Sequence, residues 1–127
     1  MKYEYLYKAF KKEIPEGFYF REIKEKENLI DDTDGMHVVF GMVIVPYILH
    51  IVLNKKTSEI NKVFSFLENM AICKDTKVNE VLDFTVLEQL ADEDSDKLRQ
   101  CKQYMGINTL KQCEEIEAVM FNVKGDS

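Results

Sequence analysis

Two histidines and three cysteines are the residues of this chain best suited to metal binding or nucleophilic catalysis. His37 and His50 lie thirteen positions apart, and no cysteine stands at zinc-ligand spacing from either. Cys73, Cys101 and Cys113 include no CxxC pair, and each falls on the core face of a predicted helix. We therefore expect core or boundary histidines and inert buried thiols, not a metal site or a Cys–His nucleophile pair.

The segment 31–35, Asp-Asp-Thr-Asp-Gly, has the composition of a calcium-binding loop. If Gly35 is the sixth position of such a loop, the first and twelfth positions fall on Ile30 and Gly41. Neither residue has a side-chain carboxylate, so the calcium loop is excluded. The segment is predicted to be a turn, with Asp34 capping the helix that follows it.

Catalytic and nucleotide-binding motifs are missing from the sequence. The 23 acidic residues are numerous, but a catalytic carboxylate pair needs two groups across a cleft, one with a raised pKa. The chain contains neither GxxxxGK[ST] nor GxGxxG, the glycine patterns that bind nucleotide phosphates. We predict a protein that is not an enzyme and that uses no cofactor.

Composition describes a globular protein that is rich in helix. The 127 residues fit one domain, with 46% hydrophobic and 31% charged residues and only five Gly and two Pro. The start of the chain has no apolar leader, and an odd number of cysteines suits a reducing compartment, so we expect a cytoplasmic protein. The apolar stretch Val38–Leu53 is shorter than the about 20 residues that span a membrane, and we interpret it as core.

Acidic residues are concentrated in the second half of the chain. Residues 1–56 carry nine acids and nine bases, whereas residues 57–121 carry thirteen acids and seven bases. Between Lys77 and Lys97 there are seven acids and no base. Such a surface repels nucleic acid and anionic lipid and attracts a basic protein. The predicted partner-binding residues, with two apolar anchors among the acids, are Glu80, Asp83, Phe84, Leu87, Glu88, Asp92, Glu93, Asp94 and Asp96.

Two alternatives to a docking face stay open. The acids form an ordinary solvated surface in the first, and Phe84 and Leu87 are plain core residues in the second. Charge reversal at Asp83, Asp92 and Asp94 is expected to slow association with a partner, with little loss of fold.

Apolar residues at helical spacing predict where these side chains are placed. The segment 36–53 is ambiguous, because its β-branched residues favour strands and its length favours a helix; we choose a kinked core helix, with Pro46 at the kink. Residues near 18–30 are predicted to form a short strand or an extended loop. The remaining predicted helices are 3–14, 58–72, 76–91, 95–105 and a last one that reaches 121.

Helix ends are predicted from local capping residues. Asp75 is expected to cap the helix that follows it, and Gly106 to end a helix in the left-handed conformation. Thr109 and Gln112 form a capping box for the last helix, and residues 122–127 are expected to fray.

Short connections make the predicted helices antiparallel neighbours. The pairs 58–91 and 95–121 form a weak repeat, which indicates stacked helix pairs in a short α-solenoid or a bundle. The predicted organisation is one helical domain over 1–127, with an N-terminal helix and irregular segment at 1–35 and the helical stack at 36–121.

Three motifs in this region, FSFLENM, VxEVLxxTVLEQL and YMGxxTL, follow a GxxxxPY segment at Gly41–Tyr47. Over residues 36–117 the chain resembles a family of small bacterial single-domain proteins with HEAT-like helix pairs. The resemblance implies an all-α fold and no catalytic residues. Many members are presumed immunity proteins, which are encoded beside a secreted toxin and block its activity.

The function expected from residues and resemblance together is therefore binding. The first expectation is an immunity protein, monomeric or weakly dimeric, that neutralises a cognate toxin; a basic nuclease domain would suit the acidic surface. It would not itself bind nucleic acid or a membrane. The alternative is a helical adaptor or regulatory protein that homodimerises or bridges partners.

Overall fold

The computed structural model describes residues 1–125, and the side chains of residues 1–121. The chain is all-α over this range, as predicted, and no strand occurs in it. The elements in chain order are η1 (Tyr3–Tyr5), α1 (Leu6–Glu13), α2 (Phe18–Glu27), α3 (Met36–Val39), η2 (Phe40–Ile44), α4 (Val45–Leu53), α5 (Thr57–Ala71), α6 (Thr76–Val81), η3 (Leu82–Leu87), α7 (Glu88–Ala91), α8 (Ser95–Lys102) and α9 (Ile107–Gly125).

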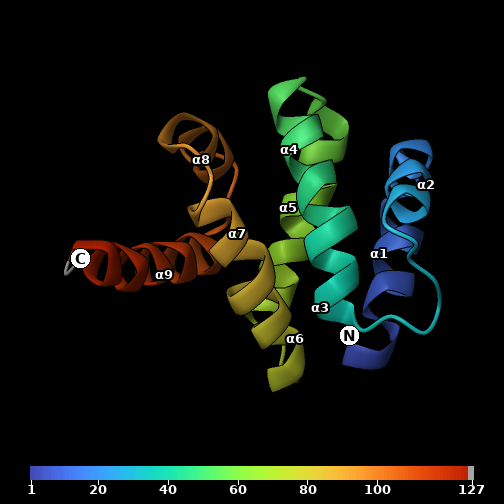
Figure 1. Ribbon diagram of the computed structural model, residues 1–127, viewed down its shortest axis with the longest axis horizontal. Coiled ribbons are helices and arrows are strands. Elements are labelled where there is room, and N and C mark those ends of the chain that lie inside the picture. The colour runs from blue at the N-terminus through green and yellow to red at the C-terminus, as the bar shows by residue number, and fades with distance from the viewer. Residues whose placement is uncertain (126–127) are drawn as a thin grey trace.

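The helices form three groups side by side. The long helix α3–η2–α4 lies in the middle with α5 behind it, α1 and α2 lie on one flank, and α6 to α9 lie on the other (Figure 1). Most of these helices run roughly up and down the molecule, but α9 lies across that direction and its end projects from the body (Figure 1). The acid-rich elements are thus gathered on one flank.

The core is one contiguous cluster, and Phe10 of α1 lies at the meeting point of three other elements. Its ring makes edge-on contacts with Phe40 at 6.0 Å, Tyr47 at 6.3 Å and Phe66 at 5.1 Å between ring centroids. All four side chains are fully buried. Edge-to-face aromatic pairs add stabilisation beyond their buried area, so this cluster holds α1 against the central helices.

The prediction of a strand or loop near 18–30 is wrong, because residues 18–27 form α2. The residue that α2 buries most deeply is the charged Arg21. Its guanidinium donates to the carbonyl oxygens of Ile14 at 2.6 Å and Glu16 at 3.1 Å. It also lies over the rings of Phe10 and Tyr47. A charged residue in the core position hides the apolar stripe by which a helix is recognised in sequence.

The segment 36–53 is one continuous helix, as predicted, and not a pair of strands. Its irregularity is the π-helical segment η2, which lies just before Pro46: the Val45 amide donates to Phe40 O, five residues back. Proline has no amide hydrogen, so the carbonyl of Met42 loses its α-helical donor. The Asn28 side chain supplies a donor to that oxygen at 3.4 Å.

A second π-helical segment, η3, interrupts the predicted helix 76–91, and the two segments contact each other. Gly41 of η2 allows the close approach: a β-carbon there would lie 2.7 Å from Nε2 of Gln89 and 3.3 Å from Cγ2 of Thr85. Near the same crossing, Nδ1 of His37 is within hydrogen-bonding distance of Oγ1 of the buried Thr85. The side chains of Thr85 and Gln89 therefore pack against the backbone of η2 at Gly41.

The helix 36–53 is the one described helix long and apolar enough to cross a membrane by length and composition. Half of that stretch is buried inside the protein, and its inward side chains, such as Phe40 and Ile48, belong to the central core cluster. A core helix of a soluble protein has this pattern.

One of the predicted helix caps is confirmed. The side chain of Asp75 caps α6, as predicted, by accepting from the Lys77 amide at 3.0 Å. It also accepts from the amide of Tyr3 at 3.0 Å. Beside it, the thiol of Cys73 donates to the carbonyl of Met1 at 3.4 Å. The N-terminal turn is thus attached to the turn between α5 and α6.

The cap predictions at Asp34 and Gly106 are wrong. Asp34 accepts from the Asp31 amide within its own turn, and α3 starts without a side-chain cap. Gly106 does not have the positive φ of a left-handed cap. The tail prediction is partly wrong, because α9 continues to Gly125, and residues 126–127 lie outside the described range.

The predicted capping box at Thr109 is replaced by a distant cap. The carboxylate of Glu68 on α5 accepts from the amides of Asn108 at 3.0 Å and Thr109 at 2.9 Å, and from both side chains. These amides are the unpaired donors at the start of α9. Glu68 therefore fixes the direction in which α9 leaves the body.

Replacing Glu68 by Ala is expected to lower the free energy of unfolding by about 1 to 2 kcal/mol, the usual effect of losing a helix cap. Burial raises the pKa of Glu68, but the hydrogen bonds outweigh it and hold the pKa below its ordinary 4.5. The stabilisation is therefore present above pH 4.5 and lost as the pH falls through the folded pKa. Urea unfolding at several pH values, with Glu68→Gln as the isosteric control, checks both points; equal acid sensitivity in all three proteins contradicts them.

Candidate functional site: an acidic surface beside an apolar groove

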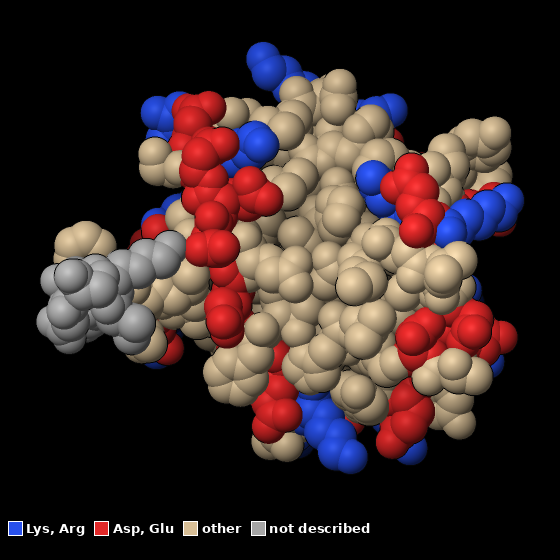
Figure 2. Space-filling model, in the orientation of Figure 1, with Lys and Arg blue, Asp and Glu red and all other residues tan. Residues whose placement is uncertain are grey.

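The predicted binding residues do share one side of the molecule, with one exception. Figure 2 shows acidic side chains gathered in a column on the flank formed by α6 to α9. Leu87 is fully buried, so its prediction as a binding anchor is wrong; its side chain is core. Phe84 is 64% exposed and is available as an anchor. Among the acids, Asp83 and Glu93 are partly buried, and the exposed ones are Glu80, Glu88, Asp92, Asp94 and Asp96.

The acids near the start of α8 already have structural roles. Asp94 caps α8 by accepting from the Lys97 amide at 2.9 Å, and the Lys97 ammonium lies 3.8 Å from both Asp94 and Glu93. Asp96 pairs with Arg99. Their charge is therefore partly compensated, and less of it is available to attract a partner than the count of acids suggests.

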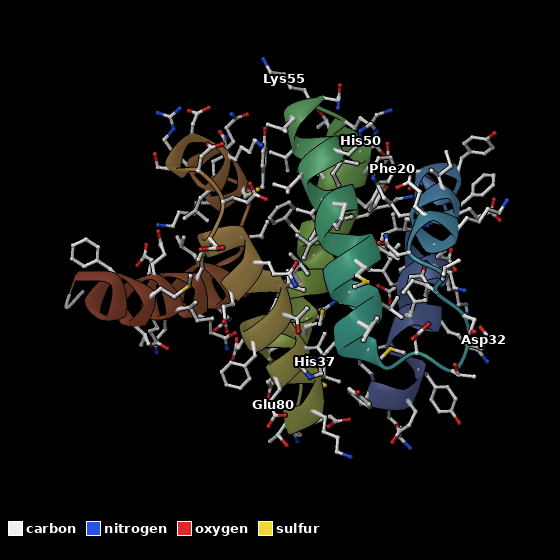
Figure 3. All side chains as sticks on the ribbon, viewed as in Figure 1. Phe20, Asp32, His37, His50, Lys55 and Glu80 are labelled. Carbon is white, nitrogen blue, oxygen red and sulfur yellow. The ribbon has the colours of Figure 1, made fainter. Side chains whose placement is uncertain are left out.

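The acids of the helix 76–91 are different. Within residues 1–121, no Lys or Arg forms an ion pair with Glu80, Asp83 or Glu88. Glu80 lies in the lower part of the helix 76–91, away from α8 (Figure 3). The uncompensated part of the acidic surface is thus centred on α6, η3 and α7.

A groove of about 550 Å³ lies between this helix and α9. Its floor is mainly apolar, and the charged residues that line it within 1–121 are all carboxylates. The π-helical segment and α7 contribute one wall, and the outward face of α9 contributes the other. The lining residues are Asp83, Phe84, Glu88, Gln112, Glu115, Ile116, Val119 and Met120.

Two residues that line the groove each carry a buried acceptor without a donor. Within the described part of the chain, Oδ1 of Asp83 and Oε1 of Gln112 have no hydrogen-bond partner. Burial, and then the negative charge of Glu115, raise the pKa of Asp83. Leaving a buried acceptor unpaired costs free energy. The groove therefore favours the binding of a hydrogen-bond donor or a cation.

The α9 wall was not predicted from the sequence. Ile116 and Met120 are partly buried and line the groove, and Ile116 also packs against the core cluster. The signal was present: α9 carries apolar residues on more than one face, and Ile107, Val119 and Phe121 are 82%, 64% and 74% exposed. A single neighbouring element covers one apolar face, so a helix with two apolar faces leaves the second face exposed.

The residues with metal-binding or nucleophilic potential do not converge. His37 and His50 lie near opposite ends of the central helix (Figure 3), and the His50 ring stacks on Phe20 with centroids 4.4 Å apart. Burial raises the pKa of Cys101 to about 12 and that of Cys113 to about 11, so both thiols are protonated. Within the described residues no group of three His, Cys, Asp or Glu side chains is placed to hold a metal ion.

The acidic turn at 31–35 is closed by its own side chains. Oδ1 of Asp31 accepts from the amide and the hydroxyl of Thr33, and these bonds lower the pKa of Asp31. The prediction of a turn at this position is confirmed.

A family model described as a domain of unknown function (DUF7674) matches residues 6–120. No curated protein and no solved structure matches the chain significantly.

Proposed function

The chain belongs to the DUF7674 family, and we propose that it is a non-catalytic protein-binding module that docks a basic partner on the flank formed by α6 to α9. The observation that carries the proposal is the groove: an apolar floor, three carboxylates and, among the side chains of residues 1–121, no basic group in its lining. Apolar anchors supply affinity, and surrounding charge of one sign supplies encounter rate and specificity.

The same groove is poorly equipped for catalysis. A carboxyl group with a raised pKa in a cleft, such as Asp83 beside Glu115, is a feature of acid–base sites. Hydrolytic sites also need a donor for the charge that develops on the substrate. Among the residues whose side chains the structure describes, the lining contains no Lys, Arg, His, Ser or Thr. The arrangement therefore favours holding a cation over stabilising an anion.

We further propose that the partner is a bacterial toxin and that the protein is its cytoplasmic immunity protein. Tight inhibition at nanomolar dissociation constants corresponds to about −12 kcal/mol and requires about 800 Å² of surface from each partner. The helix 76–91 and α9, about 24 and 28 Å long at 1.5 Å per residue, provide a surface of that scale. HEAT-like pairing of α5 with α6–α7 and of α8 with α9 is part of this proposal.

A nuclease toxin suits the charge of this surface best. The active-site groove of a nuclease is basic because it binds a polyanion. The acidic column would occupy that groove in place of the substrate. The steric block requires no chemistry from the immunity protein.

The test is the product of the neighbouring gene. The purified protein is expected to bind that product at nanomolar concentration and to abolish its toxicity on co-expression. Isothermal titration calorimetry and a growth assay measure the two effects. If the neighbouring product is neither bound nor inhibited, the immunity assignment is wrong.

The alternative function is a helical adaptor that homodimerises or bridges partners. Exposed apolar residues on α9 favour it, since Val119 and Phe121 lack a neighbour to cover them. Charge contacts are screened within about 8 to 10 Å near physiological salt, whereas apolar contacts persist. Self-association that survives high salt in sedimentation experiments would favour the adaptor.

A further inference from the structure

We propose that the groove binds a helix of the partner and that one Lys or Arg side chain of that helix inserts between Asp83, Gln112 and Glu115. This inference rests on the proposed function and specifies the chemistry of the partner. Apolar residues on either side of the inserted cation would cover Phe84, Ile116, Val119 and Met120.

The geometry of α9 supports a helical occupant. The lining residues of α9 are spaced at 112, 115, 116, 119 and 120, which are successive positions along one face of a helix. An exposed helix face with this spacing beside a second helix forms a trough, and amphipathic helices bind in such troughs through residues three, four and seven positions apart. The stripe covers about 12 Å of helix axis, or about two turns of a bound helix.

The unpaired acceptors specify what the bound helix contributes at its centre. Among the described residues nothing donates to the buried Oδ1 of Asp83 or Oε1 of Gln112, and Glu115, which lines the same groove, raises the pKa of Asp83. An ammonium or guanidinium group has several donors and a positive charge. A single Lys or Arg would therefore pair both acceptors and relieve the repulsion between the two carboxylates.

Charge also decides against the other occupants of an apolar groove. A second copy of this chain would place its own acid-rich flank, with thirteen acids against seven bases over residues 57–121, against the same acids. Nucleic acid and anionic lipid would be repelled for the same reason. A basic amphipathic segment matches both the floor and the rim.

Asp83 gives the inference a distinctive signature. Because its pKa is raised on folding, the carboxylate destabilises the free protein, and stability is lost as the pH rises through the folded pKa. The charged groups that line the groove with it are Glu88 of α7 and Glu115 of α9, and both are acids. Asp83→Asn is therefore expected to raise the urea midpoint at neutral pH while it weakens binding of a cation. If the Asp83 carboxylate instead stabilised the fold, Asp83→Asn would lower the urea midpoint.

The probe is a synthetic Ala-based helical peptide of about 18 residues, with a Leu ridge at helical spacing and one central Arg. Matched peptides replace the Arg by Gln or the Leu ridge by Ser. Binding to the full chain is followed by methyl NMR shifts of Ile116, Val119 and Met120. Asp83→Asn and Phe84→Ala are compared with the control Glu22→Gln, which removes the same charge from an exposed residue of the opposite flank.

The expected result is that the Arg–Leu peptide shifts these methyl signals and that Asp83→Asn weakens its affinity about tenfold, the effect of one charged hydrogen bond. Phe84→Ala is also expected to weaken binding, and Glu22→Gln to change it less than about twofold. The Gln peptide and the Ser peptide are each expected to bind about tenfold more weakly than the parent.

Three results would overturn the inference: no shift at the groove methyls, equal affinity for the Arg and Gln peptides, or a salt-resistant dimer of this chain that Phe84→Ala dissociates. The proposed function fails separately. If the neighbouring gene product is inhibited by the Asp83→Asn and Phe84→Ala variants as well as by the unchanged protein, the groove inference is wrong and the immunity function stands. If the peptide binds the groove but the neighbouring product is not bound, the groove inference stands and the immunity function is wrong.

Discussion

Reversing the charge of Glu80, Glu88 and Glu115 to Lys together is expected to slow association with a basic partner by about 10- to 100-fold at low salt. The three side chains are exposed, and within the described residues none has an ion-pair partner. The free energy of unfolding should therefore change by about 0.5 kcal/mol or less for each substitution. Stopped-flow association with the neighbouring gene product, at several salt concentrations, measures the effect.

The structure changes which acids are suitable for this experiment. Reversal at Asp94, which the sequence suggested, would remove the cap of α8, and Asp83 is partly buried. Both would confuse loss of fold with loss of binding.

The matched control reverses Glu13, Glu22 and Asp32, which are exposed residues of the opposite flank. It changes the net charge by the same amount. If both triple variants slow association equally, net charge alone acts and the surface is not a docking site. If neither does, the partner binds elsewhere.

Replacing Arg21 by Ala is expected to lower the free energy of unfolding by about 3 kcal/mol. The substitution removes the donors to the carbonyl oxygens of Ile14 and Glu16. It also leaves a cavity between the rings of Phe10 and Tyr47, over which the guanidinium lies. These contacts join the turn after α1 to the central helix. Urea unfolding followed by circular dichroism measures the change.

The control is Arg21→Lys, which keeps the charge but loses the planar fork of donors. An intermediate loss is expected, because one ammonium group cannot stack on the rings and reach both carbonyls equally well. If the Ala variant is as stable as the unchanged protein, the buried arginine does not hold α2 in place and the account of this turn is wrong.

The helices with a regular apolar stripe could be predicted from the sequence to within a few residues. The prediction 58–72 corresponds to α5 at Thr57–Ala71, because α5 buries one face with apolar residues alone. The helix α2 could not be predicted in this way, since its deepest core residue is Arg21. The π-helical segments also escape prediction, because they depend on how two helices cross at Gly41.

One of the two walls of the groove could be predicted from the sequence. A run of acids without a base is visible in the sequence, and it identifies one wall of the groove. Which face of a helix stays uncovered is decided by tertiary packing, so the sequence left open whether Leu87 is surface or core and did not identify Ile116 as a groove residue. The cap of α9 by Glu68, some forty positions earlier, likewise has no local signal.

The attachment of the N-terminal turn to the α5–α6 turn also has a consequence during synthesis. Tyr3 and Asp75 are 72 positions apart, so the ribosome makes the first long before the second. At about 5 to 20 residues per second, the delay is roughly 4 to 15 s. Throughout that interval the Tyr3 amide of the nascent polypeptide lacks the Asp75 carboxylate that accepts its hydrogen bond. The first aromatic residues likewise emerge ahead of the helices that bury them.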